Sequence, residues 1–221
     1  MTADLLKLCI KRYPQLSVCK DDIQKSHDII EKSFRNGGKL LVCGNGGSAS
    51  DSGHIVGELL KSFCIKRQID PNIRKIVGDD IADNLQGAMP AISLPDLVSI
   101  NTAYANDCNP QYVFAQLVYG LGNSGDVLIG ISTSGNSANV NLAAIVAKAK
   151  GMHVIGLTGR SGGKLLKNCD VCVRAPEDET YKIQELHLPI YHTLCLMLEE
   201  TFFGEKNKSL TFGKKQHLWF R

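Results

Sequence analysis

The sequence lacks an apolar run of the roughly 18–20 residues that a membrane-spanning helix needs. Its first residues, Met1 to Asp4, also lack the basic segment and the long apolar stretch of a secretory signal. We therefore expect a cytoplasmic protein with no membrane partner. The length of 221 residues is enough for one α/β domain with a substantial core.

Cysteine arrangements typical of a metal or redox centre are also largely missing. Eight cysteines are present, and Cys9, Cys43 and Cys195 lie in apolar runs, where cysteine behaves as a small hydrophobic residue in a reducing compartment. The spacing of Cys169 and Cys172 could hold zinc or support redox chemistry. Neither a second C-x-x-C nor a nearby histidine pair accompanies it, so we interpret this pair as structural.

Most of the chain has little net charge. The formal charge is +3, and residues 205–221 carry five basic residues and one glutamate, or +4, which leaves −1 for residues 1–204. We expect 205–221 to be a basic, disordered tail. A nucleic-acid partner is not favoured, because the basic excess is not spread over the domain.

The apolar pattern predicts helices that alternate with strands, with no internal repeat and no linker. Residues 64–90 interrupt this alternation as a charged insertion in which two short helices are expected. The pattern is typical of a parallel sheet covered on both faces, so we predict an α/β, doubly wound sheet of about five strands in one domain, residues 1–204. The predicted strands are 39–43, 91–94, 127–132, 154–158 and 170–174, and the predicted helices are 5–13, 23–34, 50–63, 95–105, 110–121, 137–150 and 179–203.

Two loops rich in glycine and serine follow predicted strands, and ligands of such sheets bind beyond these strand ends. The first loop, residues 44–49 (GNGGSA), matches the dinucleotide fingerprint. That fingerprint also requires an acidic residue about 20 positions on, and residues 63–67 contain none. A nicotinamide cofactor is therefore not favoured, and a tight turn that needs glycine remains the plain alternative.

The second loop, residues 132–137 (STSGNS), places four hydroxyl groups just before a helix. Exposed N–H groups and the positive dipole at a helix start suit a phosphate, and hydroxyls add neutral donors. Capping alone would need only one of these side chains. The P-loop pattern of nucleoside triphosphatases is absent, so the loop predicts a different phosphate site.

A metal site is suggested by His54 and Glu58, whose spacing of four residues puts both on one helix face. A histidine from the last helix could complete a zinc site with an open position for substrate. The alternative, a purely structural pair, is about equally supported by these residues alone.

The last helix offers Gln184, His187 and His192. Gln184 and His192 are eight residues apart, or about 12 Å on a regular helix. Both could reach one ion only if Gln184 lies at the helix entry, or if Pro189 kinks the helix. His187 would face elsewhere, and we interpret it as structural.

Four segments in order resemble the phosphoheptose isomerases of the sugar-isomerase (SIS) domain superfamily. They are residues 43–59 (CGNGGSASDSGHIVGEL), 125–140 (GDVLIGISTSGNSANV), 151–165 (GMHVIGLTGRSGGKL) and 183–192 (IQELHLPIYH), and the similarity spans about residues 20–203. The resemblance implies a flavodoxin-like SIS sandwich. It also implies a metal-dependent enzyme that converts sedoheptulose 7-phosphate to D-glycero-D-manno-heptose 7-phosphate through an enediol, in a homotetramer with sites near subunit contacts.

The resemblance further implies roles for individual residues. Glu58 and His192 would be the catalytic acid/base pair. One zinc ion per subunit would be bound by His54, Glu58, Gln184 and His192. The phosphate would be held by Ser132, Thr133, Ser134 and Ser137, and further substrate contacts would come from Asn45, Gly46, Gly47, Asn106, Asp107 and Gln184.

Some features depart from the family pattern. The insertion at 64–90 is long, an arginine that members carry soon after the glutamate has no clean equivalent, and Tyr181 and Lys182 stand where members have an aspartate. Two alternatives therefore stay open. One is a non-catalytic SIS protein that senses sugar phosphates or assists replication initiation, which the retained metal set argues against. The other is an isomerase of a different sugar phosphate, such as a hexose or amino-sugar phosphate.

Overall fold

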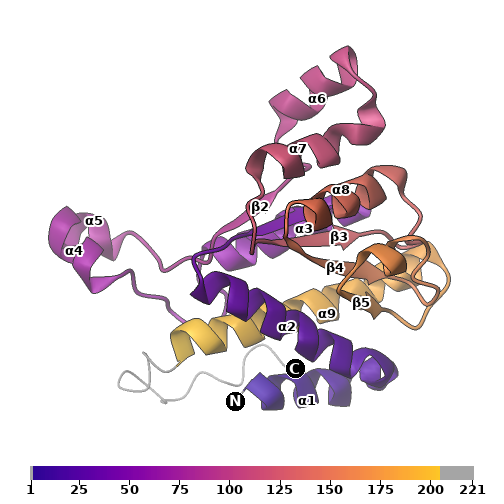
Figure 1. Cartoon of the computed structure of the whole chain (residues 1–221). Helices are drawn as coiled ribbons and strands as arrows, with labels where there is room; N and C mark the ends of the chain where they lie inside the picture. Colours follow the sequence, from indigo (N-terminus) through magenta and orange to yellow (C-terminus); the bar gives the residue numbers. More distant parts are fainter. Residues whose placement is uncertain (1, 205–221) are drawn as a thin grey trace.

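The structure, a computed structural model, describes residues 2–204 of the chain. Its centre is a sheet of five parallel strands in the order β2-β1-β3-β4-β5. The strands are β1 (Leu40–Cys43), β2 (Ala91–Ser93), β3 (Val127–Ile131), β4 (His153–Thr158) and β5 (Val171–Arg174). The predicted doubly wound parallel fold is confirmed (Figure 1).

The strands are short apolar runs because both faces of the sheet are covered. Every residue of β1 and β3 is buried. Side chains alternate along β1: Leu40 and Val42 join the core on one face, and Leu41 and Cys43 join the core on the other.

Two helical layers enclose the sheet (Figure 1). The first core contains residues of α1 (Thr2–Arg12), α2 (Lys20–Arg35), α3 (Gly47–Leu60) and α9 (Thr180–Glu199). The second contains residues of α7 (Val113–Leu121) and α8 (Ala138–Ala149), with α6 (Val98–Asp107) beyond α7. Short 3₁₀ helices are η1 (Pro14–Cys19), η2 (Pro110–Tyr112) and η3 (Leu165–Asn168).

Most predicted helix boundaries differ from the structure by a few residues. Helix α3 begins at Gly47, three residues before the predicted start, because Gly46 turns the chain with a positive φ of 57°. The segment 110–121 starts as the 3₁₀ turn η2 before α7. Helix α9 ends at Glu199 and is followed by the π-helical turn η4 (Glu200–Gly204), and it runs unbroken through Pro189.

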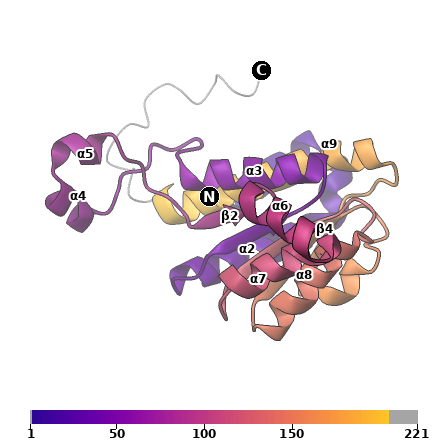
Figure 2. The ribbon, with the colours of Figure 1, turned by 90° about the horizontal axis from the view of Figure 1, so that it is seen from above.

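The insertion forms a separate arm, which we define as residues 68–86. It contains the two expected short helices, α4 (Pro71–Val77) and α5 (Asp79–Asp83), and projects from the body in both views (Figures 1 and 2). A hydrogen bond of 3.2 Å from Gly87 N to Arg67 O closes its base.

The two thiols of the C-x-x-C pack beside one glycine of the sheet. A Cβ atom on Gly156 would lie 2.7 Å from Cys169 Sγ and 3.1 Å from Cys172 Sγ. The thiols thus occupy space that a larger residue in β4 would close. This packing supports the structural interpretation, which stays a prediction.

Two expectations concern the rest of the chain. The basic segment 205–221 lies outside the described residues, so its disorder stays a prediction, as does the division into one domain and a tail. No helix within residues 2–204 is long and apolar enough to cross a membrane.

A buried ion pair joins the ends of α3 and α9. The guanidinium of Arg67 lies 2.7 Å from Glu199 Oε1, and both side chains are about fully buried, at 0% and 1% exposed. Arg67 also donates to the carbonyls of Leu59 and Glu58 at 2.7 and 2.9 Å, which are the last carbonyls of α3. The Glu199 carboxylate accepts three backbone N–H bonds from residues 63–65, at 2.8, 2.8 and 3.0 Å.

Breaking this pair on one side leaves a buried charge without its partner. We predict that Glu199→Gln lowers the free energy of unfolding by about 3–5 kcal/mol, as is typical of such losses. Urea unfolding at fixed protein concentration measures it. Asp178→Asn, which breaks the exposed pair with Arg160, is the control and should leave the urea midpoint unchanged. Equal midpoints in the two variants would contradict a stabilising role for the buried pair.

Candidate active site

The two glycine- and serine-rich loops meet at the carboxyl edge of the sheet. Asn45 of the first loop and Asn139 of α8 exchange two side-chain hydrogen bonds of 2.9 Å. An open hollow of about 390 Å³ lies beside them. It is lined by Asn45, Pro110, Gln111, Ser137, Ala138 and Asn139.

The second loop is held rigidly around its hydroxyl groups. The buried Ser132 Oγ lies 3.0 Å from Ser137 Oγ and accepts from Ser137 N at 3.4 Å. Gly135 has a φ of 66°, and a Cβ there would lie only 2.0 Å from Gly162 O, so only glycine fits. Thr133 O accepts from Gly159 N at 2.9 Å, which ties the loop to the end of β4.

Helix α8 starts directly after this loop, with Ser137 as its cap residue and no side-chain capping bond. Its first N–H groups therefore face the loop together with the positive end of the helix dipole. Hydroxyls and amide groups thus lie together here in an arrangement that suits a phosphate, and the predicted phosphate site stays a prediction.

The first loop brings α9 against the start of α3. A Cβ on Gly47 would lie 2.6 Å from Gln184 Nε2, so the glycine makes room for this amide. Gln184 lies in the first turns of α9, as the sequence required for a residue near the site.

His54, Glu58 and His192 converge where α3 packs beside α9. His54 Nε2 lies 3.3 Å from Glu58 Oε1 and 3.4 Å from His192 Nε2. The Glu58 carboxylate is mostly buried, and its Oε2 accepts from Lys61 Nζ at 3.1 Å. The i, i+4 pair predicted from the sequence thus faces the last helix.

Hydrogen bonds behind His54 determine which of its ring nitrogens carries the proton. Tyr191 Oη lies 3.2 Å from Asp51 Oδ1 and 3.0 Å from His54 Nδ1. The phenol has one proton, and the carboxylate can only accept, so Tyr191 donates to Asp51 and accepts from His54 Nδ1–H. In a neutral His54 the proton is then on Nδ1, and the lone pair on Nε2 faces Glu58 and His192.

Burial also affects the acidities in this cluster. It lowers the pKa of His192, and the neighbouring His54 lowers it further, which favours the neutral imidazole. Burial raises the pKa of Asp51, although the bond from Tyr191 opposes this. His187 is different: it is fully buried, its Nε2 lies 3.2 Å from Thr158 O, and burial lowers its pKa to about 4. This is the core position that the sequence indicated.

His54 has two groups beside it of the kinds that bind a divalent metal ion, but within residues 2–204 only the group on α2 described below has three ligand atoms that all lie within 4.8 Å of one another. A lone pair on His54 faces a carboxylate oxygen and a second, preferentially neutral imidazole, and such acceptors meet favourably around a cation. Two imidazole nitrogens and one carboxylate oxygen are ligands that zinc prefers, and they leave a further position for substrate.

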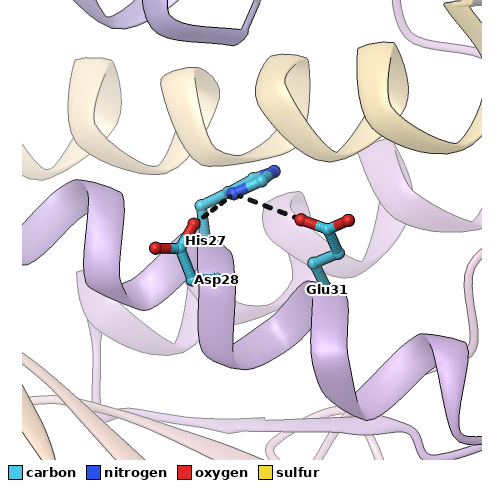
Figure 3. Close-up of side chains that lie close together, drawn as sticks. All are labelled: His27, Asp28 and Glu31. Atoms are coloured by element: carbon cyan, nitrogen blue, oxygen red, sulfur yellow. Dashed lines mark hydrogen bonds and ion pairs between the residues drawn. The ribbon is translucent and has the colours of Figure 1, made fainter.

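A second group of side chains of the types that can bind a metal lies on α2, away from the two loops. His27, Asp28 and Glu31 have ligand atoms within 4.8 Å of one another, and Figure 3 shows His27 Nδ1 facing both carboxylates. Asp28 already accepts from Gln24 at 2.8 Å, and Glu31 pairs with Arg35 at 2.8 Å. His27 Nε2 lies 3.0 Å from Thr201 Oγ1, so the group connects α2 to η4.

Three predicted site residues stand apart from the cluster. Asn106 and Asp107 end the helix α6, which buries no residue, and they bond to each other at 2.8 Å. Gln184 lies over Gly47, seven residues or about 10 Å of helix before His54. Within residues 2–204, the side chain of Gln184 shows no hydrogen bond to His54, Glu58 or His192.

Sequence reasoning missed Asp51 and Tyr191. Asp51 precedes His54 by three residues and Glu58 by seven, so all three lie on one face of α3. This spacing in the sequence could have identified Asp51 as a neighbour of the site. Tyr191 adjoins His192, but only the packing of α9 on α3 shows that its hydroxyl reaches His54.

Comparisons with known proteins identify the family of this chain. The SIS domain family matches residues 15–159. Phosphoheptose isomerases from Burkholderia pseudomallei and Roseiflexus are 40% and 42% identical over 184 and 176 residues, which is 83% and 80% of this chain and 84% and 80% of theirs. The structure of a phosphoheptose isomerase from Neisseria gonorrhoeae matches with a TM-score of 0.71 and 33% identity, covering 90% of this chain and 96% of the other. One from Francisella tularensis gives 0.73 and 32%, covering 86% and 91%.

The parallel sheet, the hydroxyl loop and the SIS match define a sugar-phosphate-binding protein of the SIS class. Within this class, the chain belongs to the phosphoheptose isomerases, a family of sugar-phosphate isomerases. The resemblance found in the sequence is thereby confirmed.

The hydroxyl loop generates a binding prediction. Ser132→Ala with Ser134→Ala removes two donors while the backbone of the loop is still held by its bonds to residues 159 and 165. We expect KM for a sugar phosphate to rise at least tenfold, or about 1.4 kcal/mol, with a native circular dichroism spectrum. Steady-state kinetics measures it, with the exposed Ser124→Ala as control; an unchanged KM would remove the loop from the site.

Proposed function

We propose that this chain isomerises sedoheptulose 7-phosphate to D-glycero-D-manno-heptose 7-phosphate, with the help of a bound zinc ion. One observation carries the proposal: a loop of neutral hydroxyl groups and a His/Glu/His cluster follow neighbouring strands at the same edge of the sheet. Relatives named phosphoheptose isomerase match over more than three quarters of both chains, which supports the choice of sugar.

The reaction moves one proton between two neighbouring carbons. Glu58 would take the proton from the carbon next to the carbonyl and return it to the other carbon, through an enediol. Its carboxylate is suited to this because it is mostly buried and is oriented by Lys61 at 3.1 Å. His192, favoured as a neutral imidazole, would move the second proton between the two sugar oxygens.

The phosphate end of the sugar would be bound by Ser132, Thr133, Ser134 and Ser137. Asn45, Gly46 and Gly47 would contact the chain of hydroxyls between the two ends. Because the hydroxyl loop is rigid, the fixed phosphate would set which carbon reaches Glu58.

Zinc would be held by His54, Glu58 and His192, with Gln184 as the expected fourth ligand. When bound, zinc polarises a carbonyl and stabilises the negative charge that develops on its oxygen. Asp51 and Tyr191 would keep His54 oriented, as carboxylates behind metal-bound histidines do.

We further propose a homotetramer in the cytoplasm. Helix α6 supports the assembly, because it buries none of its residues although it carries Asn106 and Asp107 at its end. If α6 packed on another copy of the chain, Asn106 and Asp107 would lie close to the active site of that copy.

The proposed base can be tested directly. Glu58→Gln keeps the size of the side chain and removes its basicity, so we expect kcat to fall by about 10²–10⁴. Turnover is measured on sedoheptulose 7-phosphate within a panel of pentose, hexose and amino-sugar phosphates. Glu31→Gln, in the group on α2, should retain kcat. Turnover of the Glu58 variant within tenfold of wild type would exclude it as the base, and a better substrate in the panel would reassign the sugar.

The metal can be tested without activity. We expect one zinc ion per subunit in protein purified without chelator, and a sharp loss of occupancy in His54→Ala and in His192→Ala. Gln184→Ala should lose less, because a neutral amide oxygen binds zinc more weakly than imidazole. Elemental analysis measures occupancy, and Asp28→Asn is the control that distinguishes the group on α2. Full occupancy in His192→Ala, or loss of zinc in Asp28→Asn, would place the metal elsewhere.

A further inference from the structure

A pair of asparagine side chains joins the two loops of the candidate site. Asn45 Nδ2 donates to Asn139 Oδ1 and Asn139 Nδ2 donates to Asn45 Oδ1, both at 2.9 Å, across 94 positions of the chain. We call this contact the asparagine bridge. Asn45 lies in the first loop, and Asn139 is the second residue of α8. Both residues belong to one chain, so the bridge does not depend on contacts between copies.

The backbone fixes the orientation of the Asn139 amide. Its Oδ1 atom accepts a hydrogen bond of 3.0 Å from Val140 N, and only the oxygen of an amide group can accept from an N–H group. The Nδ2 atom of Asn139 must therefore be the donor to Asn45. Because the two hydrogen bonds of the bridge are reciprocal, Asn45 Oδ1 is then the acceptor and Asn45 Nδ2 the donor. Asn139 thus determines which way the Asn45 amide is turned.

The Asn45 amide keeps hydrogen-bonding capacity for a ligand. An amide nitrogen of a side chain has two hydrogens, and an amide oxygen has two lone pairs. The bridge uses one of each on Asn45, so one donor and one acceptor remain. Hydroxyl groups can accept from the first and donate to the second.

The bridge borders the open hollow of about 390 Å³, and no residue that lines this hollow carries a charge. Three of its lining residues have amide side chains and one has a hydroxyl group: Asn45, Gln111, Asn139 and Ser137. A few placed polar groups of this kind fix the orientation of a ligand. Neutral donors and acceptors suit the hydroxyl groups of a sugar, so the hollow fits the polyhydroxyl part of a sugar phosphate.

The bridge also links the two parts of the site. The first loop leads directly into α3, which carries His54 and Glu58, and α8 follows the hydroxyl loop directly. A sugar phosphate held at the hydroxyl loop would have to present one carbon to Glu58. Small displacements of a reacting atom cost large factors in rate. A contact that holds the first loop against α8 therefore acts on the rate.

Stability alone gives little reason for the bridge. Both of its hydrogen bonds are exposed to solvent. Neutral hydrogen bonds at such positions replace bonds to water, so their net contribution to the free energy of folding is small. Loss of the bridge should thus affect function more than folding.

We propose that Asn139 is a positioning residue of the isomerase. It orients the Asn45 amide toward the hydroxyl groups of the bound sugar and holds the first loop in register with α8. Asn139 acts through Asn45 and takes no part in the proton transfers. This inference rests on the proposed function, because it assigns Asn139 a part in that reaction.

Asn139→Ala removes both hydrogen bonds of the bridge. We expect kcat/KM for sedoheptulose 7-phosphate to fall at least tenfold, because Asn45 loses its orientation. The dissociation constant of inorganic phosphate, measured by calorimetry, should stay within twofold, because the hydroxyl loop is intact. The circular dichroism spectrum and the urea midpoint should match wild type. Asn36→Ala is the control: this exposed residue ends α2 just before β1, at the opposite edge of the sheet, and kcat/KM should not change.

A double-mutant cycle distinguishes positioning from an independent contact. If Asn139 acts through Asn45, the variant with Asn45→Ala and Asn139→Ala should lose no more kcat/KM than Asn45→Ala alone. If the two residues act separately, the two losses should multiply. Steady-state kinetics of the two single variants and the double variant measures the coupling.

The outcomes separate this role from the proposed function. An active wild type with unchanged kcat/KM in Asn139→Ala, or with multiplied losses in the double variant, would overturn the positioning role and leave the proposed function intact. Weaker binding of inorganic phosphate in Asn139→Ala would show that the residue shapes the hydroxyl loop, which would also overturn it. A wild type that turns over no sugar phosphate of the panel would contradict the proposed function. The calorimetric affinity for sedoheptulose 7-phosphate then replaces kcat/KM in the cycle, and absence of that binding would overturn both.

Discussion

The parallel packing of α3 on α9 is the contact on which the rest of the site depends. Gly47 faces Gln184 at one end, His54 meets His192 in the middle, and the segment after α3 is bonded to Glu199 at the other end. The buried pair of Arg67 and Glu199 fixes this last point. A buried charge pair has directional bonds that sliding helices would break, so it sets the register of the two helices. The histidines of two distant segments can face each other only in that register.

The hydroxyl loop at residues 132–137, the proposed phosphate site, depends on a different constraint, the close approach of backbone segments. Gly135 leaves no room for a side chain against Gly162, and the loop is bonded to the ends of β4 and η3. Its hydroxyls and amides are then preorganised, so little reorganisation is needed when an anion binds.

The two histidine groups show why proximity alone does not identify a metal site. Around His27 the carboxylates already have donors from Gln24 and Arg35, and Thr201 lies at the other ring nitrogen. In the group around His54, the Nδ1 atom of His54 is hydrogen-bonded to Tyr191. Its Nε2 atom faces the Glu58 carboxylate and the His192 imidazole. The difference lies in which atoms still lack a partner, a property of the packed structure.

The sequence by itself determined the alternation of strands and helices, because buried strands and amphipathic helices impose different periods on the chain. It also indicated a candidate phosphate loop, since residues 132–137 concentrate hydroxyls at a strand end, and it determined the pairing of His54 with Glu58, since i, i+4 spacing is local. That His192 joins them was implied by the family resemblance, and its contact with His54 appears only in the tertiary structure. The tertiary structure alone decided that Tyr191 and Asp51 orient His54 and that Gln184 lies over Gly47. It also decided that Arg67 pairs with a glutamate 132 residues away. These contacts join segments whose separation in the chain carries no period or spacing signal, so only the packing of α3 on α9 brings them together.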